Sequence, residues 1–225
     1  MQKIRVKICC ICSIEDAKLA IAYGASALGL VGHMPSGPGV ISNPKILEIT
    51  KSVPPMVSTF LLTSETKAAV VIDHYKKVNT STIQIVDALE NRDYEQIKNE
   101  LPHVKIVQVI HVLDDKSVAE AIGVSAYVDA ILLDSGNPNL ETKELGGTGR
   151  THNWDLSRQI RDQIDIPVFL AGGINRNNVK QAIEHVQPFG VDLCSSVRTN
   201  GKLDENKLKL FFQTIQSIHQ HQSSI

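Results

Sequence analysis

The sequence has no excess of charge of either sign and no long run of apolar residues. Its 225 residues carry a formal net charge of -1 at pH 7, and no long basic block occurs. Binding to nucleic acid needs clustered positive charge that neutralises phosphates, so we predict no nucleic-acid partner. No apolar run reaches the roughly 20 residues that a membrane-spanning helix needs, so we predict no association with a membrane.

The N-terminal region also lacks the charged segment, apolar core and cleavage site of a secretory signal. Cysteine is scarce, with four residues: Cys9, Cys10, Cys12 and Cys194. We therefore expect no disulfide framework and predict a cytoplasmic protein. Three cysteines within four residues suggest a metal site at first. Spaced pairs of ligands are missing, however, and neighbouring strand residues point to opposite faces, so we predict no metal.

What the sequence does contain is an alternation of short apolar runs and amphipathic helical patterns, with 42% hydrophobic and 21% charged residues. Runs that are apolar throughout suit parallel strands buried on both faces. Eight strand–helix units predict an α/β fold, a single TIM (βα)8-barrel domain over residues 1–225. A doubly wound open sheet is the alternative, because counting strands does not establish closure. The strand-like runs lie at residues 4–9, 27–31, 56–62, 82–86, 104–110, 128–133, 167–171 and 191–194.

The last two strands end in small residues, which predicts a phosphate site. Gly172 and Gly173 allow a ligand to approach the backbone, and Asn175 is expected to cap the next helix, whose free N–H groups favour an anion. Ser195 and Ser196 follow the last strand. A Gly-Gly pair by itself is more often a plain tight turn. The phosphate interpretation gains from the barrel, whose usual phosphate site follows strands seven and eight.

Two further strand ends carry candidate acid–base groups. Asp134 closes the apolar run that begins at Ala130, and burial there would raise its pKa and suit a general acid. A helix cap or loop hydrogen bond is the plainer role. Cys9 ends the first strand and is either a small buried apolar residue or a base that needs a nearby cation. Lys7, two residues earlier, is expected deeper on the same face.

Taken together, these segments resemble the phosphoribosylanthranilate isomerase family over nearly the whole chain. The segments are Val6–Cys9, Ala130–Asp134, Gly146–Gly149 with Trp154, Leu170–Gly173 with Asn178–Val179, and Val191–Asp192 with Ser195. The resemblance implies an enzyme, an intramolecular oxidoreductase of the aldose–ketose type that acts in tryptophan biosynthesis without metal or organic cofactor. It also implies a phosphorylated sugar substrate, and we expect a monomer or a homodimer.

The resemblance also implies roles for individual residues. Asp134 protonates the ribose ring oxygen, and Cys9 removes the proton from C2′ in an Amadori rearrangement. The phosphate is held by Gly172, Gly173, Ser195 and Ser196, and the substrate loop contains Gly146, Gly147 and Arg150.

Several positions depart from the family pattern. Cys10 and Ser196 replace glycines, Gly39 replaces an arginine used near the anthranilate carboxylate, and Val86-Asp87 replaces His-Gly. The departures concern recognition of the aromatic acid, for which Arg150 or Arg198 are the substitute cations that we consider. Two alternatives follow: a divergent paralogue acting on another phosphorylated aminosugar, and a non-catalytic phosphate-binding barrel. Retention of both Cys9 and Asp134 favours an enzyme.

Overall fold

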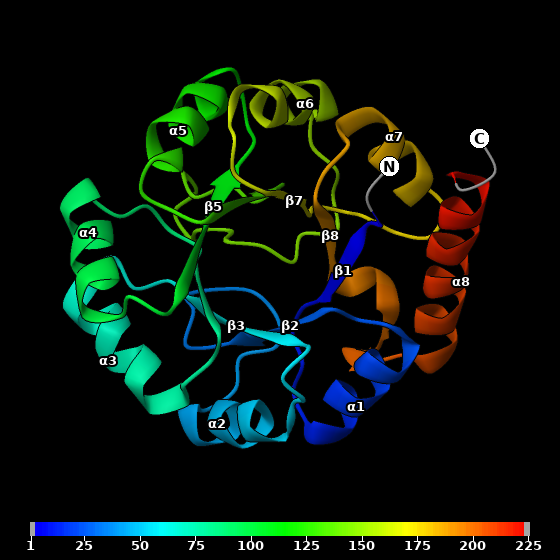
Figure 1. The fold of residues 1–225 in the computed structure, drawn as a ribbon, viewed down its shortest axis with the longest axis horizontal. Helices are drawn as coiled ribbons and strands as arrows, with labels where there is room; N and C mark the ends of the chain where they lie inside the picture. Colours follow the sequence, from blue (N-terminus) through cyan, green and yellow to red (C-terminus); the bar gives the residue numbers. More distant parts are fainter. Residues whose placement is uncertain (1–2, 223–225) are drawn as a thin grey trace.

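Eight parallel strands form a closed barrel in the computed structural model, which describes residues 3–222 (Figure 1). Each strand pairs with the next in the sequence, and β8 pairs with β1 in a register that sets Ile8 opposite Leu193. The prediction of a closed barrel is therefore confirmed, and the open sheet is wrong. The strands are β1 (Arg5–Ile8), β2 (Ala27–Val31), β3 (Ser58–Thr63), β4 (Thr82–Ile85), β5 (Lys105–His111), β6 (Ala130–Asp134), β7 (Val168–Leu170) and β8 (Gly190–Leu193).

A helix follows each strand and packs on the outside of the barrel (Figure 1). Local signals in the sequence explain several of the helix ends. Ser13 accepts a hydrogen bond from the backbone N–H of Asp16, and Gly24 ends the same helix with a positive φ of 113°. The helices are α1 (Ile14–Tyr23), α2 (Asn43–Ser52), α3 (Ala68–Val78), α4 (Asn91–Glu100), α5 (Lys116–Ser125), α6 (Trp154–Gln163), α7 (Val179–Val186) and α8 (Glu205–Gln222).

Side chains alternate between the barrel interior and the helix-facing side of each strand. On β6, Ile131 and Leu133 pack in the layer between strands and helices. Ala130 and Leu132 belong to a second apolar cluster inside the barrel. This two-residue period sends Asp134 inward as well. The strands are thus buried on both faces, as their uniformly apolar sequences predict.

One segment has no counterpart in the predicted elements. After β8 the chain forms a 3-10 turn (Ser195–Val197) and a small hairpin of β9 (Arg198–Thr199) and β10 (Lys202–Leu203) before α8 begins. The hairpin holds the end of β8 against the N-terminal end of α8, where the backbone N–H of Asp204 donates to the carbonyl of Val197 at 2.9 Å. Within residues 3–222, none of the helices is both long and apolar enough to cross a membrane.

Candidate active site

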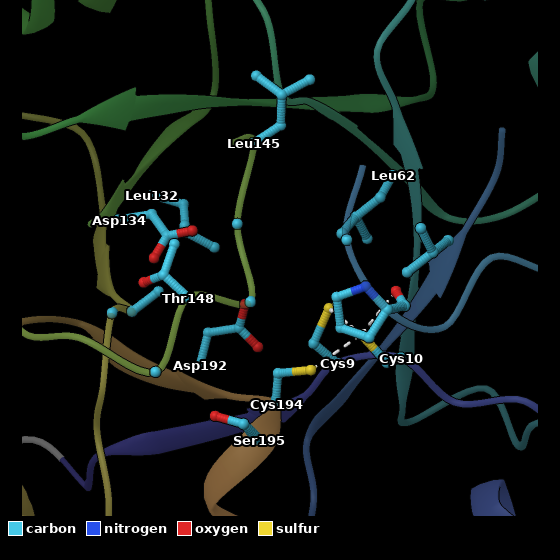
Figure 2. A pocket seen from close by; sticks show the side chains of 18 of the residues that line it. Cys9, Cys10, Leu62, Leu132, Asp134, Leu145, Thr148, Asp192, Cys194 and Ser195 are labelled. Atoms are coloured by element: carbon cyan, nitrogen blue, oxygen red, sulfur yellow. Dashed lines mark hydrogen bonds between the residues drawn. The ribbon is translucent and has the colours of Figure 1, made fainter. Parts of the chain in front are cut away.

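A cavity of about 70 Å³, partly open to solvent, lies at the mouth of the barrel to which the carboxyl ends of the strands point (Figure 2). This is the end of a (βα)8 barrel at which enzymes of this fold carry their active sites. Cys9, Asp134, Gly172, Gly173 and Ser195 all contribute to its wall, so the structure brings these sequence-predicted residues together. Other lining residues include Cys10, Met34, Ser36, Leu62, Gln84, Leu132, Leu145, Gly146, Gly147, Thr148, Asp192 and Cys194.

Asp134 lies at the end of β6 with its carboxyl group buried. Burial raises its pKa, and the backbone N–H of Ser135, which donates to Oδ1 at 2.8 Å, only partly opposes this effect. A Cβ atom at Gly146 would lie 2.9 Å from Oδ2, so the covering loop reaches the carboxyl group only because it has glycine there. A dry carboxyl group that retains its proton is suited to general acid catalysis.

Cys9 lies across the cavity from Asp134, next to an internal ion pair. Lys7 Nζ is 2.8 Å from Asp192 Oδ2, and the lysine side chain is fully buried. Gly29 on β2 makes room for the pair, because a Cβ atom there would lie 2.9 Å from Cys9 Sγ and 3.1 Å from Lys7 Nζ. Burial alone would lower the pKa of Lys7, but Asp192 and Cys9 raise it above its usual value. A buried cation therefore lies beneath the Cys9 thiol, as the two-residue spacing on β1 predicts.

The turn after β7 is held by two asparagine side chains. Nδ2 of Asn175 and Nδ2 of Asn178 both donate to the carbonyl oxygen of Gly173 at 3.0 Å. The predicted role of Asn175 as a helix cap is wrong, because α7 begins at Val179 and Asn178 occupies the cap position. Side-chain bonds within the turn, rather than a helix start, determine the direction of the Gly172-Gly173 backbone.

The predicted phosphate residues differ in their surroundings. Gly172, Gly173 and Ser195 line the cavity. Ser196 is absent from that lining, and its Oγ is buried without a hydrogen-bond partner among residues 3–222. A Cβ atom at Gly173 would lie 2.7 Å from the backbone carbon of Arg150, so the loops after β6 and β7 pack backbone against backbone.

Two loops form a roof over the cavity: residues 32–42 after β2 and residues 135–153 after β6. Ser36 Oγ donates a short hydrogen bond to the carbonyl of Lys143. A Cβ atom at Gly147 would lie 2.7 Å from Pro38 Cδ, so only glycine permits this contact between the loops. Inside the second loop, the hydroxyl oxygens of Ser135 and Thr148 are hydrogen-bonded to each other at 2.6 Å. The predicted substrate-loop residues Gly146 and Gly147 thus lie in the roof of the cavity.

The two arginines considered as substitute cations lie outside the cavity wall. Arg150 is exposed and pairs with Glu144 at 2.5 Å. Arg198 is buried and donates to the carbonyl oxygens of Cys10 at 2.6 Å and Cys194 at 3.1 Å. Among the residues that the structure describes, no Lys, Arg or His lines the cavity. Its wall presents apolar groups, hydroxyls, an amide, thiols, backbone and two carboxyl groups.

Two departures from the family pattern are sterically linked. Cys10 has a φ of 60°, a left-handed conformation in which glycine is more usual. Gly39, in the loop after β2, lies against it with a φ of 81°, and a Cβ atom there would lie 2.5 Å from Cys10 Cβ. With cysteine at position 10, position 39 has no space for an arginine side chain. Cys10 and an arginine at position 39 are therefore incompatible in this packing.

Gln84 was not predicted as a site residue from the sequence, but its amide lines the cavity. Its Oε1 is buried and has no partner within the described residues. The available signal was its position on the inward face of β4, two residues before Val86. Asp87, just after β4, and His111, the last residue of β5, do not line the cavity. Asp87 pairs with Lys143 at 2.5 Å, and His111 Nε2 contacts the carbonyl of Val86 at 3.1 Å.

No group of three or more His, Cys, Asp or Glu residues within the described part of the chain is arranged to hold a metal ion.

The sequence is similar to those of known proteins over nearly its whole length. A family model described as N-(5'-phosphoribosyl)anthranilate (PRA) isomerase matches residues 6–214. N-(5'-phosphoribosyl)anthranilate isomerase 1 of Methanosarcina mazei is 32% identical to the chain over 95% of each sequence. The Methanocaldococcus jannaschii isomerase is 31% identical over 96% of this chain and 98% of its own.

Solved structures are similar over the same extent. The isomerase from Thermotoga maritima superposes with a TM-score of 0.82 at 28% identity, covering 95% of this chain and 99% of that one. A phosphoribosyl anthranilate isomerase in complex with reduced 1-(O-carboxyphenylamino)-1-deoxyribulose 5-phosphate gives a TM-score of 0.79 at 26% identity, with the same coverage.

Proposed function

This chain belongs to the N-(5'-phosphoribosyl)anthranilate isomerase family, and we propose that it catalyses the family's rearrangement with Asp134 as acid and Cys9 as base. The observation that supports this assignment is one cavity that joins the two groups to the strand ends around Gly173 and Ser195. The product of the reaction is the carboxyphenylamino-deoxyribulose phosphate of tryptophan biosynthesis. C1′ is reduced and C2′ is oxidised within one molecule, so the reaction requires no external electron acceptor.

Asp134 carries out the first step. It donates its proton to the ring oxygen of the ribose, and the ring opens to a Schiff base. Burial keeps this carboxyl group protonated to a higher pH than an exposed aspartate. The backbone of Gly146 packs against one side of the group.

Cys9 carries out the second step. Its thiolate removes the proton from C2′, and the resulting enolamine tautomerises to the ketone. The buried ammonium group of Lys7, two residues earlier on β1, lies beneath this sulfur. Asp192 holds the lysine in place at 2.8 Å, so it acts on Cys9 through Lys7 and is a positioning residue.

The phosphate of the substrate binds at the ends of β7 and β8. Backbone N–H groups around Gly172, Gly173, Ser195 and Ser196 are the donors, and the asparagine-held turn presents them in a fixed direction. Binding energy from this remote group orients the sugar between Asp134 and Cys9. The ligand class is therefore a phosphorylated sugar.

The aromatic acid of the substrate lies under the roof, near Ser36 and Thr148. No cation lines the described part of that region, so its carboxylate is matched by hydroxyl and backbone donors. Neutral donors bind a carboxylate more weakly than a guanidinium does. We therefore expect a high KM for phosphoribosylanthranilate compared with relatives that retain the arginine. We place the enzyme in the cytoplasm, as a monomer or a homodimer.

The test is an assay of the purified protein on phosphoribosylanthranilate and on matched phosphorylated aminosugars whose aromatic group lacks the carboxylate. Turnover of the first substrate, lost on substitution of Asp134 or Cys9, supports the proposal. A higher kcat/KM on the carboxylate-free compounds would indicate a paralogue with another substrate. Phosphate binding without turnover of any of them would indicate a non-catalytic barrel.

A further inference from the structure

Three of the four cysteines gather at one side of the cavity, and two of them are in direct contact (Figure 2). The sulfur atoms of Cys10 and Cys194 are 3.0 Å apart, although the residues are separated by 184 positions in the sequence. Both thiols line the cavity, and Cys10 is one of the departures from the family pattern, which has glycine there. We infer that Cys10 and Cys194 form a reversible disulfide, a modification site for disulfide oxidants at the edge of the active site.

The backbone geometry suits this bond. Cys10 follows β1 and Cys194 follows β8, and these strands are hydrogen-bonded neighbours with Ile8 opposite Leu193. Cys10 lies two residues beyond Ile8 and Cys194 one residue beyond Leu193, so the two cysteines are offset by one position, and the left-handed turn at Cys10 accompanies the approach of their sulfur atoms to 3.0 Å. The sulfur atoms must approach by about 1 Å to reach the S–S bond length of about 2.05 Å. No change in strand register is needed.

The two thiols differ in a way that assigns their roles. Cys194 is partly exposed, whereas Cys10 is buried. The hydrogen bond between them lowers the pKa of Cys194, burial opposes this, and the guanidinium of Arg198 lowers it further. The hydrogen bonds to Cys194 and Cys9, with burial, raise the pKa of Cys10. Cys194 is thus the accessible nucleophile, and Cys10 is the thiol that resolves the intermediate.

The reaction balances with a low-molecular-weight disulfide such as oxidised glutathione. The Cys194 thiolate attacks one sulfur of the oxidant, forms a mixed disulfide and releases one thiolate. Cys10 then loses its proton and attacks the Cys194 sulfur, and a second thiolate leaves. Two protein thiols are oxidised and one disulfide is reduced to two thiols.

The other cysteines fit the pairing less well. Cys9 lies 3.8 Å from Cys10, farther than Cys194 does, and as a sequence neighbour it leaves the strand toward another side. Cys12 donates to the carbonyl of Cys10 at 3.2 Å and is not in contact with Cys194 in any described hydrogen bond. Cys12 therefore serves as a matched control.

Closing the bond ties the end of β1 to the end of β8, between Cys9 and Ser195. If the proposed function is correct, this displaces the base relative to the phosphate site. A shift of about 1 Å in a catalytic group can cost roughly 10²-fold in rate. The oxidised enzyme is therefore expected to turn over far more slowly, and a dithiol reductant restores it.

The experiment treats the fully reduced protein with oxidised glutathione. Free thiols are then counted under denaturing conditions, and the peptides are mapped by mass spectrometry. We expect the four thiols to fall to two, with the peptides containing Cys10 and Cys194 joined. Cys12→Ser should still form the bond. Cys194→Ser and Cys10→Gly should not, and glycine suits the φ of 60° at position 10, so the fold is retained.

A bond between Cys9 and Cys10, or no intramolecular bond in the folded wild type, would overturn the inference. Turnover is measured in parallel. An inactive reduced enzyme that still forms the Cys10–Cys194 bond would refute the proposed function and leave the thiol pair standing. Bond formation with unchanged turnover would refute only the effect on catalysis.

Discussion

Asp134 differs from an ordinary surface aspartate in that it is only 8% exposed and its carboxyl group accepts from the backbone N–H of Ser135. Asp134→Asn retains the shape and removes the transferable proton. We expect kcat to fall by about 10²-fold or more, the usual scale of a general acid. Because the change removes little buried volume, the denaturation midpoint should stay close to that of the wild type. Steady-state kinetics and denaturant unfolding test both points, and unchanged kcat would remove Asp134 from the acid role.

The raised pKa of Asp134 also gives a pH dependence with a definite sign. The acid form donates the proton, so kcat is retained at pH values where an exposed aspartate would be ionised, and it falls as pH rises through the raised pKa. Stability has the same sign: the contribution of this group is present below the unfolded pKa of about 3.9 and is lost as pH rises through the folded value. A pH–kcat profile without a fall in kcat at high pH would contradict the role of Asp134 as general acid.

Cys9→Ser tests the base. The hydroxyl of serine is far harder to ionise than a thiol, so proton abstraction from C2′ should slow by about 10²-fold or more. Loss of the C2′ proton can be followed separately with substrate deuterated at that carbon. Cys12→Ser is the matched control, because Cys12 lies outside the lining of the cavity, and its turnover should equal that of the wild type. Equal activity of the two variants would exclude Cys9 as the base.

On the element scale, β1 and β8 are joined by the Lys7–Asp192 pair as well as by their backbone ladder. Lys7→Met leaves Asp192 buried without its cation. Breaking a buried pair in this way costs about 3–5 kcal/mol of unfolding free energy. The control is Lys105→Met, because Lys105 pairs with Asp129 at an exposed site and should contribute only about 0–1 kcal/mol. Equal losses for the two variants in urea unfolding would show that burial does not strengthen the first pair.

The contact between the turn after β1 and the loop after β2 predicts non-additive substitutions. Gly39→Arg alone forces a Cβ atom against Cys10 and should be strongly destabilising. Cys10→Gly removes the contacts with the Cys10 side chain and leaves only its Cα at 3.0 Å, so the double variant should be more stable than the sum of the single effects predicts, by about 0.5–3 kcal/mol. The double variant should also lower the KM for phosphoribosylanthranilate, since it restores a cation for the carboxylate. Additive effects on unfolding would contradict the steric linkage.

The elements could be predicted from the sequence because each strand is apolar throughout and each helix has its own periodicity. The ends were harder to predict. Threonine is a common helix-capping residue, yet Thr63 remains in β3, where its hydroxyl contacts His74 Nδ1 at 3.2 Å, and α3 begins only at Ala68. Asn175 likewise reads as a cap but bonds to the Gly173 carbonyl. Thr63 contacts a residue eleven positions away, whereas Asn175 bonds within its own turn, where its Oδ1 also accepts from the backbone N–H of Asn177 at 2.9 Å. Residue spacing gives no sign of either arrangement.

On the scale of the whole molecule, closure brings together residues that are far apart in the sequence. The positions of Cys9 and Asp134 at one rim follow from strand order alone, because all parallel strands end on the same side. The arrangement of the two loops that form the roof does not follow from strand order. Which loops meet, and whether Arg150 points into the cavity, depends on contacts such as that of Ser36 with Lys143. The thiol pair also depends on closure, because Cys10 and Cys194 are neighbours only where β8 meets β1.

Ligand binding to the closed barrel should be visible in the stability of the whole chain. Inorganic phosphate at about 100 times its Kd stabilises a protein that binds it only when folded by about 2.7 kcal/mol. For a chain of this length that corresponds to a rise in Tm of roughly 5–11 °C. Chloride at the same ionic strength should give a much smaller rise. Thermal unfolding across a phosphate titration measures both.

A charge variant locates the bound phosphate. Ser195 is exposed at the rim, so Ser195→Asp should leave the Tm without phosphate nearly unchanged while its carboxylate repels the anion. The phosphate-dependent rise should then be largely lost. Gln213→Glu, on the exposed side of α8, introduces the same charge away from the site and should retain the full rise. If both variants keep it, phosphate binds elsewhere and the assignment to the ends of β7 and β8 fails. If both lose it, net charge rather than a defined site controls the binding.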